Sequence, residues 1–158
     1  DSSKSTLARA GIIMYGLCPN YPIPIPDEFE PVMALKAVIS HVKTVKAGDT
    51  ISYGRTFTAD KDMRIATVTI GYADGYSRLL SSKGEILVHG KRCRIVGRIC
   101  MDQLMIDVSD AEAEAGDIVT LIGRDGNDEI TADELASLYG TIGYEVVCGI
   151  SKRVPRIF

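Results

Sequence analysis

Apolar and polar residues alternate along two long stretches of the chain. Within residues 32–45 the odd-numbered positions carry the apolar side chains Met33, Leu35, Ala37 and Ile39. Residues 64–70 (RIATVTI) alternate in the same way and are rich in β-branched side chains. A two-residue period is typical of a half-buried strand, so both stretches are predicted to be β-strands.

Shorter strand-like runs follow, separated by Gly, Asp and Ser residues that favour turns. These runs cover residues 50–53, 86–88, 93–99, 103–108 and 118–122. Strands this short and this regularly spaced favour a small β-barrel or sandwich over an alternating array of strands and helices. The predicted fold class is therefore mainly β, with one or two short helices.

One helix is well signalled near the C-terminus. Thr131 and Glu134 have the spacing of a capping box, in which a threonine side chain caps the first turn. Leu135, Leu138 and Tyr139 follow at helical spacing, and Gly140 is a suitable terminator. The pattern predicts a short structural helix between Thr131 and Gly140.

The first residues have a different character. Residues 7–17 (LARAGIIMYGL) read as a buried strand followed by a turn, and residues 18–26 (CPNYPIPIP) as an extended proline-rich connector. Arg9 would lie inside the apolar strand, where a guanidinium needs an acceptor. A buried strand with almost no domain in front of it suggests that the chain is a piece of a larger protein.

Composition and charge exclude several classes of function. The 18 Lys and Arg residues against 21 Asp and Glu residues give a formal net charge of −3, and the chain has no basic run. This balance argues against a nucleic-acid partner. The longest uncharged stretch, residues 10–26, contains four prolines and is too short to cross a bilayer comfortably. Without an export signal at the start, we expect a cytoplasmic protein and no membrane contact.

Metal sites and disulfides are not indicated. The four cysteines, which have no CxxC spacing and are expected to be free thiols, are Cys18, Cys93, Cys100 and Cys148. A calcium loop starting at Asp125 would need glycine at Ile130 and glutamate at Ala136. The two histidines, His41 and His89, lack the spacing of a metal pair. We therefore expect no bound metal.

Polar side chains stand where predicted strands end. Tyr53 follows a β run and precedes Gly54, whereas Tyr72 and Arg78 flank an Ala-Asp-Gly turn. Arg98 precedes the segment Ile99–Asp102. Spacing alone favours a structural role over a catalytic one for each of these residues, and it does not define a reaction.

An ordered set of short blocks carries a more specific signal. The blocks are residues 9–16 (RAGIIMYG), 32–37 (VMALKA), 51–54 (ISYG), 71–75 (GYADG), 97–103 (GRICMDQ), 116–117 (GD), 142–145 (IGYE) and 151–156 (SKRVPR). In this order they resemble the C-terminal part of the alanine racemase family. Members of that family are bacterial pyridoxal-phosphate isomerases that interconvert L- and D-alanine.

The resemblance implies a division of the chain. Family members have an N-terminal (β/α)8 barrel followed by a mainly β domain. By this resemblance, residues 1–17 are a remnant of the end of the barrel, residues 18–31 are the connector, and residues 32–158 are the C-terminal domain. The barrel lysine that binds the cofactor has no counterpart among these residues. The isolated chain is therefore expected to be inactive and to bind pyridoxal 5'-phosphate weakly.

The resemblance also implies roles for individual residues. Tyr53 matches the catalytic tyrosine, which in the family reaches across a homodimer interface into the active site of the partner's barrel. Met101 matches the residue whose backbone contacts the carboxylate of the small amino-acid substrate, with Asp102 beside it. Residues that match the lining of the substrate entryway are Tyr72, Arg78, Arg98 and Ile150.

Four residues match positions at the cofactor. Arg9 matches the arginine that faces the pyridine nitrogen, and the backbone N–H groups of Gly11 and Ile12 match phosphate donors. Lys152 stands where well-known members have a tyrosine near the phosphate. A lysine is a mobile point charge that could still donate to phosphate, so this departure leaves the substrate preference open.

The residue types suit the chemistry that the resemblance implies. Racemisation removes a proton from one face of Cα and returns one to the other, so it needs a base on each face. A lysine serves one face and a tyrosine the other in this family. The implied role is supply of D-alanine for cell-wall peptidoglycan. Two alternatives stay open: a serine racemase domain of a membrane protein of the vancomycin-resistance type, with this segment on the cytoplasmic side, and a non-catalytic β module for binding or dimerisation.

Overall fold

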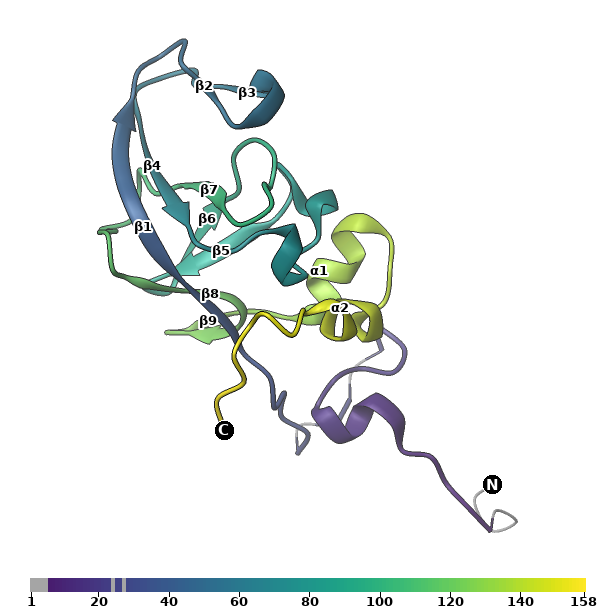
Figure 1. The fold of residues 1–158 in the computed structure, drawn as a ribbon. Coiled ribbons are helices and arrows are strands. Elements are labelled where there is room, and N and C mark those ends of the chain that lie inside the picture. Colours follow the sequence, from purple (N-terminus) through teal and green to yellow (C-terminus); the bar gives the residue numbers. More distant parts are fainter. Residues whose placement is uncertain (1–5, 24, 27) are drawn as a thin grey trace.

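The computed structural model describes residues 6–23, 25–26 and 28–158. Its strands are β1 (Leu35–Val45), β2 (Thr50–Ile51), β3 (Phe57–Thr58), β4 (Met63–Val68), β5 (Glu85–Val88), β6 (Lys91–Arg94), β7 (Leu104–Asp107), β8 (Ile118–Asp125) and β9 (Asp128–Ile130). Its helices are α1 (Ala132–Tyr139) and α2 (Gly143–Gly149) (Figure 1). The predicted mainly β fold class is confirmed.

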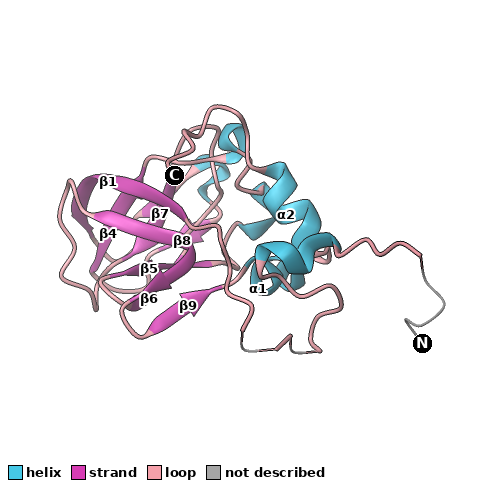
Figure 2. Cartoon of the chain, turned by 90° about the horizontal axis from the view of Figure 1, so that it is seen from below, coloured by secondary structure: helices cyan, strands magenta, loops and turns pink. Residues whose placement is uncertain are grey.

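The main sheet is antiparallel, with strand order β6-β5-β8-β1-β4-β7 and β9 added to β8. The long strand β1 pairs with β8 through its first residues and with β4 through its later ones, and its register shifts between Ile39 and His41. The helices lie to one side of the sheet (Figure 2). Strands β6 and β7 are the two edges of this order, and Ile95, directly after β6, forms a single bridge with Ile106 on β7. Within the described residues the sheet is thus sandwich-like and curled, not a closed barrel.

Most predicted strands form where the alternation placed them. In β1, Leu35 and Ile39 are buried as their shared parity predicted. The strand expected at residues 93–99 is wrong in its bounds, because β6 covers Lys91–Arg94. Gly97 has a φ of +74°, which an extended strand does not permit, so the chain turns there toward the β2 region.

The predicted helix is confirmed at both ends. Thr131 Oγ1 accepts a hydrogen bond from the Glu134 N–H at 3.0 Å, and Gly140 ends α1 with a φ of +81°. The helix buries Leu135 and Ala136 against the core. Helix α2 was not predicted, since its N-cap residue Ile142 offers no capping side chain.

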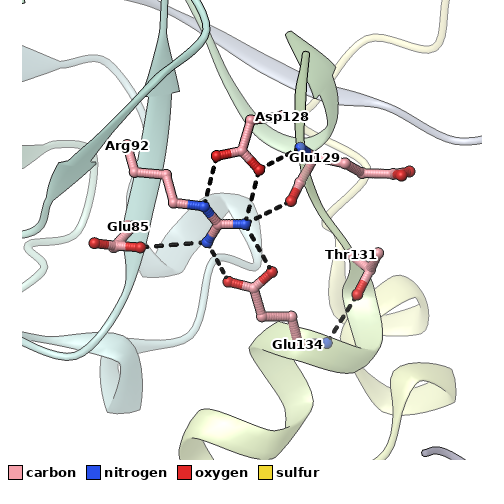
Figure 3. Close-up of polar contacts among 6 residues, drawn as sticks. All are labelled: Glu85, Arg92, Asp128, Glu129, Thr131 and Glu134. Carbon is pink, nitrogen blue, oxygen red and sulfur yellow. Dashed lines mark hydrogen bonds and ion pairs between the residues drawn. The ribbon is translucent and has the colours of Figure 1, made fainter.

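Arg92 joins three parts of the fold (Figure 3). Its guanidinium on β6 lies 2.6 Å from a carboxylate oxygen of Glu134 on α1 and 2.9 Å from one of Asp128 on β9. It also pairs with Glu85 on β5 at 3.3 Å. The Glu134 carboxylate therefore pairs with Arg92 and does not accept the hydrogen bond from the Thr131 N–H that would complete a capping box.

The N-terminal segment differs from the sequence prediction. The buried strand predicted for residues 7–17 is wrong: Gly11–Tyr15 form a 3-10 helix, and the residues from Leu7 to Ala10 are exposed coil. Gly11 and Gly16 have φ values of +66° and +70°, which interrupt an extended run. Arg9 is therefore exposed, and no buried acceptor is required for it.

The proline-rich connector is not uniformly extended either. Residues 19–22 form turns, with the Ile23 N–H donating to the Asn20 carbonyl at 2.9 Å, and the Tyr21–Pro22 bond is cis. Residues 1–5, 24 and 27, which belong to the predicted barrel remnant and connector, lie outside the described residues. The four cysteines are free thiols as expected. In the part of the chain that is described, no helix is long and apolar enough to span a membrane.

A second apolar cluster supports the small ribbon formed by β2 and β3. It consists of Val45, Ile51, Ala59, Met63, Ile65 and Val96, and it lies apart from the main core. Ile51 at the end of β2 is one of its buried members. The ribbon is thus anchored by a side chain only two residues before Tyr53.

Candidate functional site

Tyr53 lies at the tip of a tight turn that follows β2. The Arg55 N–H donates to the Ser52 carbonyl at 3.2 Å, and Gly54 takes a φ of +74° that suits glycine. The tyrosine side chain is 73% exposed. The buried Ile51 and this closed turn together present the phenol on the surface.

Two further turns come together beside Tyr53. The N–H groups of Tyr72 and Ala73 donate to the carbonyls of Cys100 and Met101, each at 3.0 Å. Gly71 makes this approach possible, because a Cβ there would lie 2.3 Å from the carbonyl oxygens of both Cys100 and Met101. The Tyr72 turn is thus fixed by its backbone to the segment that carries Met101 and Asp102.

These segments enclose a surface groove of about 590 Å³. Its lining includes six residues predicted from the sequence: Tyr53, Tyr72, Arg78, Arg98, Met101 and Asp102. Ile99, Cys100 and Gln103 complete the lining. Residues from four separate segments of the chain therefore share one hollow.

A second hollow shares lining residues with the groove. Its volume is about 680 Å³, and Tyr53, Cys100 and Gln103 line both hollows. Lys43 on β1 and Asp49 also contribute to the second hollow. Tyr53 therefore belongs to the lining of both hollows.

The charges around the groove favour an anionic ligand. Arg78 and Arg98 bring fixed positive charges, whereas Asp102 is the carboxylate in the lining. The Asp102 carboxylate lies 2.7 Å from the guanidinium of Arg153, and this hydrogen bond raises the pKa of Arg153. Arg153 also lies 3.4 Å from Asp74, next to the Tyr72 turn. With Asp102 already paired, the arginines at the groove can attract a carboxylate from solution.

The remaining predicted site residues do not line the groove. Ile12 and Ile150 are buried in the main core, whereas Arg9, Gly11 and Lys152 are exposed. Gly11 opens the N-terminal 3-10 helix, and among the described residues a Cβ there would meet the Tyr144 hydroxyl at 3.8 Å. The predicted cofactor residues thus occupy a region separate from Tyr53.

Sequence reasoning gave no role to three residues that shape the site. Ser52 precedes Tyr53, Gln103 lines both hollows, and Arg153 holds Asp102. Each lies within or beside a matched block, which is the signal that could have drawn attention to it. Among the described residues, no group of three or more His, Cys, Asp or Glu side chains could hold a metal ion.

Comparison with known proteins shows which proteins this chain is similar to. The family model described as alanine racemase, C-terminal domain, matches residues 32–158. The alanine racemase of Cutibacterium acnes is 50% identical over 157 residues, covering 99% of this chain and 42% of that protein. The alanine racemase of Desulfovibrio desulfuricans is 50% identical over 153 residues, covering 96% of this chain and 40% of that protein.

Solved structures agree. The alanine racemase of Bacillus anthracis with bound L-Ala-P superposes with a TM-score of 0.88 at 49% identity, over 94% of this chain and 38% of that one. The alanine racemase of E. faecalis gives a TM-score of 0.87 at 46% identity, over 92% of this chain and 39% of that one. The chain therefore spans about two fifths of the length of the relatives that it matches.

Proposed function

The chain belongs to the alanine racemase family, and from this membership we propose that it acts as the C-terminal domain of an enzyme that interconverts L- and D-alanine. The observation that carries the proposal is the groove in which Tyr53, Met101 and Arg98 meet. The product D-alanine would serve cell-wall peptidoglycan. In this proposal residues 1–17 end a barrel domain, residues 18–31 connect the domains, and residues 32–158 form the C-terminal domain.

Tyr53 is the proposed acid–base group on one face of the substrate. Its phenolic oxygen takes the Cα proton in one direction of the reaction and returns it in the other. A phenol has an ordinary pKa near 10, so it needs cationic or hydrogen-bonding neighbours to act as a base at neutral pH. The side chain is 73% exposed, and within the described residues no hydrogen bond reaches its hydroxyl. Such a phenol is available to a second subunit, which supports a homodimer with Tyr53 acting in the partner's active site.

The substrate carboxylate is the proposed ligand of the Met101 segment. In the described part of the chain the Met101 N–H donates no hydrogen bond, whereas its carbonyl accepts one from Ala73. A fixed turn with a free N–H group is a suitable donor to a carboxylate. Tyr72, Arg78 and Arg98 line the route by which the anion would arrive, and Ile150 is proposed to complete that route from the core side.

The residues assigned to the cofactor fit an anionic phosphate. The first N–H groups of the 3-10 helix at Gly11 and Ile12 have no partner within that helix, and Gly11 leaves room beside them. Arg9 and Lys152 add exposed positive charges. Pyridoxal phosphate, when bound, supplies the electron-withdrawing group that makes the Cα proton acidic. Arg9 would face its pyridine nitrogen as a group that does not give up its own proton.

The test is racemisation of L-alanine and L-serine by the full-length polypeptide. We expect turnover of L-alanine, and we expect Tyr53→Phe to lower kcat at least about 100-fold, because general acid–base groups contribute factors of that size. Tyr139→Phe, on α1 and away from the groove, is the matched control and should leave kcat unchanged. The 158-residue chain alone should show no turnover.

Each contrary result has a distinct meaning. Full activity of Tyr53→Phe would remove Tyr53 from the chemistry while leaving the enzyme assignment intact. Preference for L-serine would change the substrate. Absence of turnover with both amino acids would overturn the enzyme proposal in favour of a non-catalytic β module.

A further inference from the structure

Ser52 has a backbone conformation that residues with side chains rarely adopt. Its φ is +69° and its ψ is 175°. This region of backbone space is essentially reserved for glycine, because a Cβ crowds the neighbouring peptide groups. A serine persists in such a conformation only when the surrounding structure holds it there.

Several contacts hold Ser52 in place. Its Oγ donates a hydrogen bond to the Arg98 carbonyl at 2.7 Å. Gly97 leaves the space that this contact needs, since a Cβ on Gly97 would lie 2.7 Å from the Ser52 Cβ. The Arg98 guanidinium lies against the turn at Gly54, with Nη1 2.6 Å from the position of a Cβ on Gly54. Gly97 and Arg98 thus contact the turn at both Ser52 and Gly54.

These contacts of Gly97 and Arg98 determine where the Tyr53 side chain is placed. The tyrosine side chain is mostly exposed, and among the described residues none hydrogen-bonds its hydroxyl. Within this chain, the placement of the phenol in the lining of both hollows therefore depends on the backbone from Ser52 to Arg55. That backbone is fixed by the Ser52–Arg98 hydrogen bond and by the closure from the Arg55 N–H to the Ser52 carbonyl.

We propose that Ser52 is a positioning residue for Tyr53, with its hydroxyl holding an otherwise unfavourable backbone conformation so that the phenol keeps its place in the lining of the groove. The inference rests on the proposed function and deepens it. It assigns the placement of the acid–base group to the Ser52–Arg98 hydrogen bond, whose two groups take no part in the proton transfer. Backbone strain at functional sites often serves such preorganisation.

The test compares Ser52→Gly with the unaltered full-length polypeptide. Glycine accepts the φ of +69° without strain, so the variant should fold with a melting temperature close to that of the wild type. It loses the hydrogen bond from the Ser52 hydroxyl to the Arg98 carbonyl. We expect kcat to fall about 10- to 100-fold, the range that small misplacements of reacting groups produce, with little change in KM. Ser52→Ala, which keeps the strained φ without the hydrogen bond, should lose both stability and activity.

A readout that does not require turnover is fluorine NMR of fluorotyrosine placed at position 53. A held side chain gives one dispersed resonance, and in Ser52→Gly we expect it to broaden or move toward the unfolded-peptide position. His89→Gly is the matched control, because His89 also has a positive φ, of +50°, but lies in the β5–β6 turn. It should leave both kcat and the fluorine spectrum unchanged.

The outcomes separate the two claims. An unchanged fluorine resonance in Ser52→Gly, an unchanged kcat, or an increase confined to KM would overturn the positioning role. A loss of kcat that only follows the folded fraction would overturn it as well. If the wild type has no turnover but the resonance of residue 53 differs between the wild type and Ser52→Gly, the proposed reaction fails while the positioning of Tyr53 by Ser52 stands.

Discussion

Gly71 is the residue that allows the two turns of the groove to touch. A Cβ at this position would lie 2.3 Å from the carbonyl oxygens of Cys100 and Met101, and both belong to rigid backbone. We expect Gly71→Ala to push the Tyr72 turn away from Met101. Overpacking of this kind costs about 1–3 kcal/mol of unfolding free energy. Thermal denaturation and racemisation by the same full-length variant measure the two effects, and kcat/KM should fall more than about 10-fold because substrate-positioning groups tolerate little displacement.

Gly149→Ala is the control for that substitution. A Cβ on Gly149 would meet only the Gly75 carbonyl oxygen, at 3.7 Å, which is ordinary van der Waals contact. Its melting temperature should stay near that of the wild type. Equal losses in the two variants would show that added volume alone, and not the contact at Gly71, is responsible.

At the residue scale, the sequence identified side chains but not backbone conformations. Tyr53, Tyr72 and Arg98 were selected by resemblance, and the structure places all three at one groove. The strained φ of Ser52 has no compositional signal, because serine is common in ordinary turns. Arg9 was misjudged, since burial was inferred from apolar neighbours without knowing whether a strand would form.

At the element scale, prediction succeeded where local signals were redundant. Helix α1 has a side-chain cap, apolar spacing and a terminal glycine that all agree. Helix α2 has none of these at its start, and it forms because Val146 packs into the core and α1 lies against it. Tertiary packing therefore decides α2, and a single sequence does not reveal it.

The Arg92 cluster is a polar contact that joins several elements of the fold. Replacing Arg92 with Gln leaves the carboxylates of Glu85, Asp128 and Glu134 close together without a cation. The groups are partly exposed, so screening by water limits the effect, and we expect a loss of about 1–2 kcal/mol of unfolding free energy. Denaturation at low and high salt checks this, and the deficit of the variant should shrink as salt screens the remaining carboxylates.

Arg124→Gln is the matched control for Arg92→Gln. Arg124 forms one ion pair, with Glu129 at 3.1 Å, and its side chain is 75% exposed. Exposed single pairs contribute little, so its melting temperature should hardly change. A similar loss in both variants would mean that the cluster adds nothing beyond an ordinary surface pair.

At the scale of the whole molecule, the alternation pattern predicts strands but does not predict their order in the sheet. The first long strand, β1, pairs with β4 on one side and with the distant β8 on the other. The groove exists only because this path brings residues near 53, 72, 78 and 98–103 together. Spacing along the chain gave no reason to group them, whereas the ordered family blocks did.

The core as a whole is expected to weaken at alkaline pH. Burial raises the pKa of the Cys93 thiol to about 11 and also raises the pKa of the Tyr76 hydroxyl. Both groups keep their protons to higher pH in the folded chain than in the unfolded chain, where the thiol ionises from about pH 9 and the phenol from about pH 10. Their contribution to stability is complete below pH 9 and is lost as the pH rises. We expect the Cys93 part of this loss to reach roughly 2 kcal/mol at pH 11.

Melting temperatures of cysteine variants between pH 7 and pH 11 isolate the thiol contribution. Cys93→Ala removes the titrating group from the core, so its melting temperature should fall less steeply above pH 9 than that of the wild type. Cys148→Ala removes an exposed thiol that lies outside the core, so its decline should parallel the wild type. If Cys93→Ala also follows the wild-type curve, the alkaline loss must come from other groups, with Tyr76 the first to test by Tyr76→Phe.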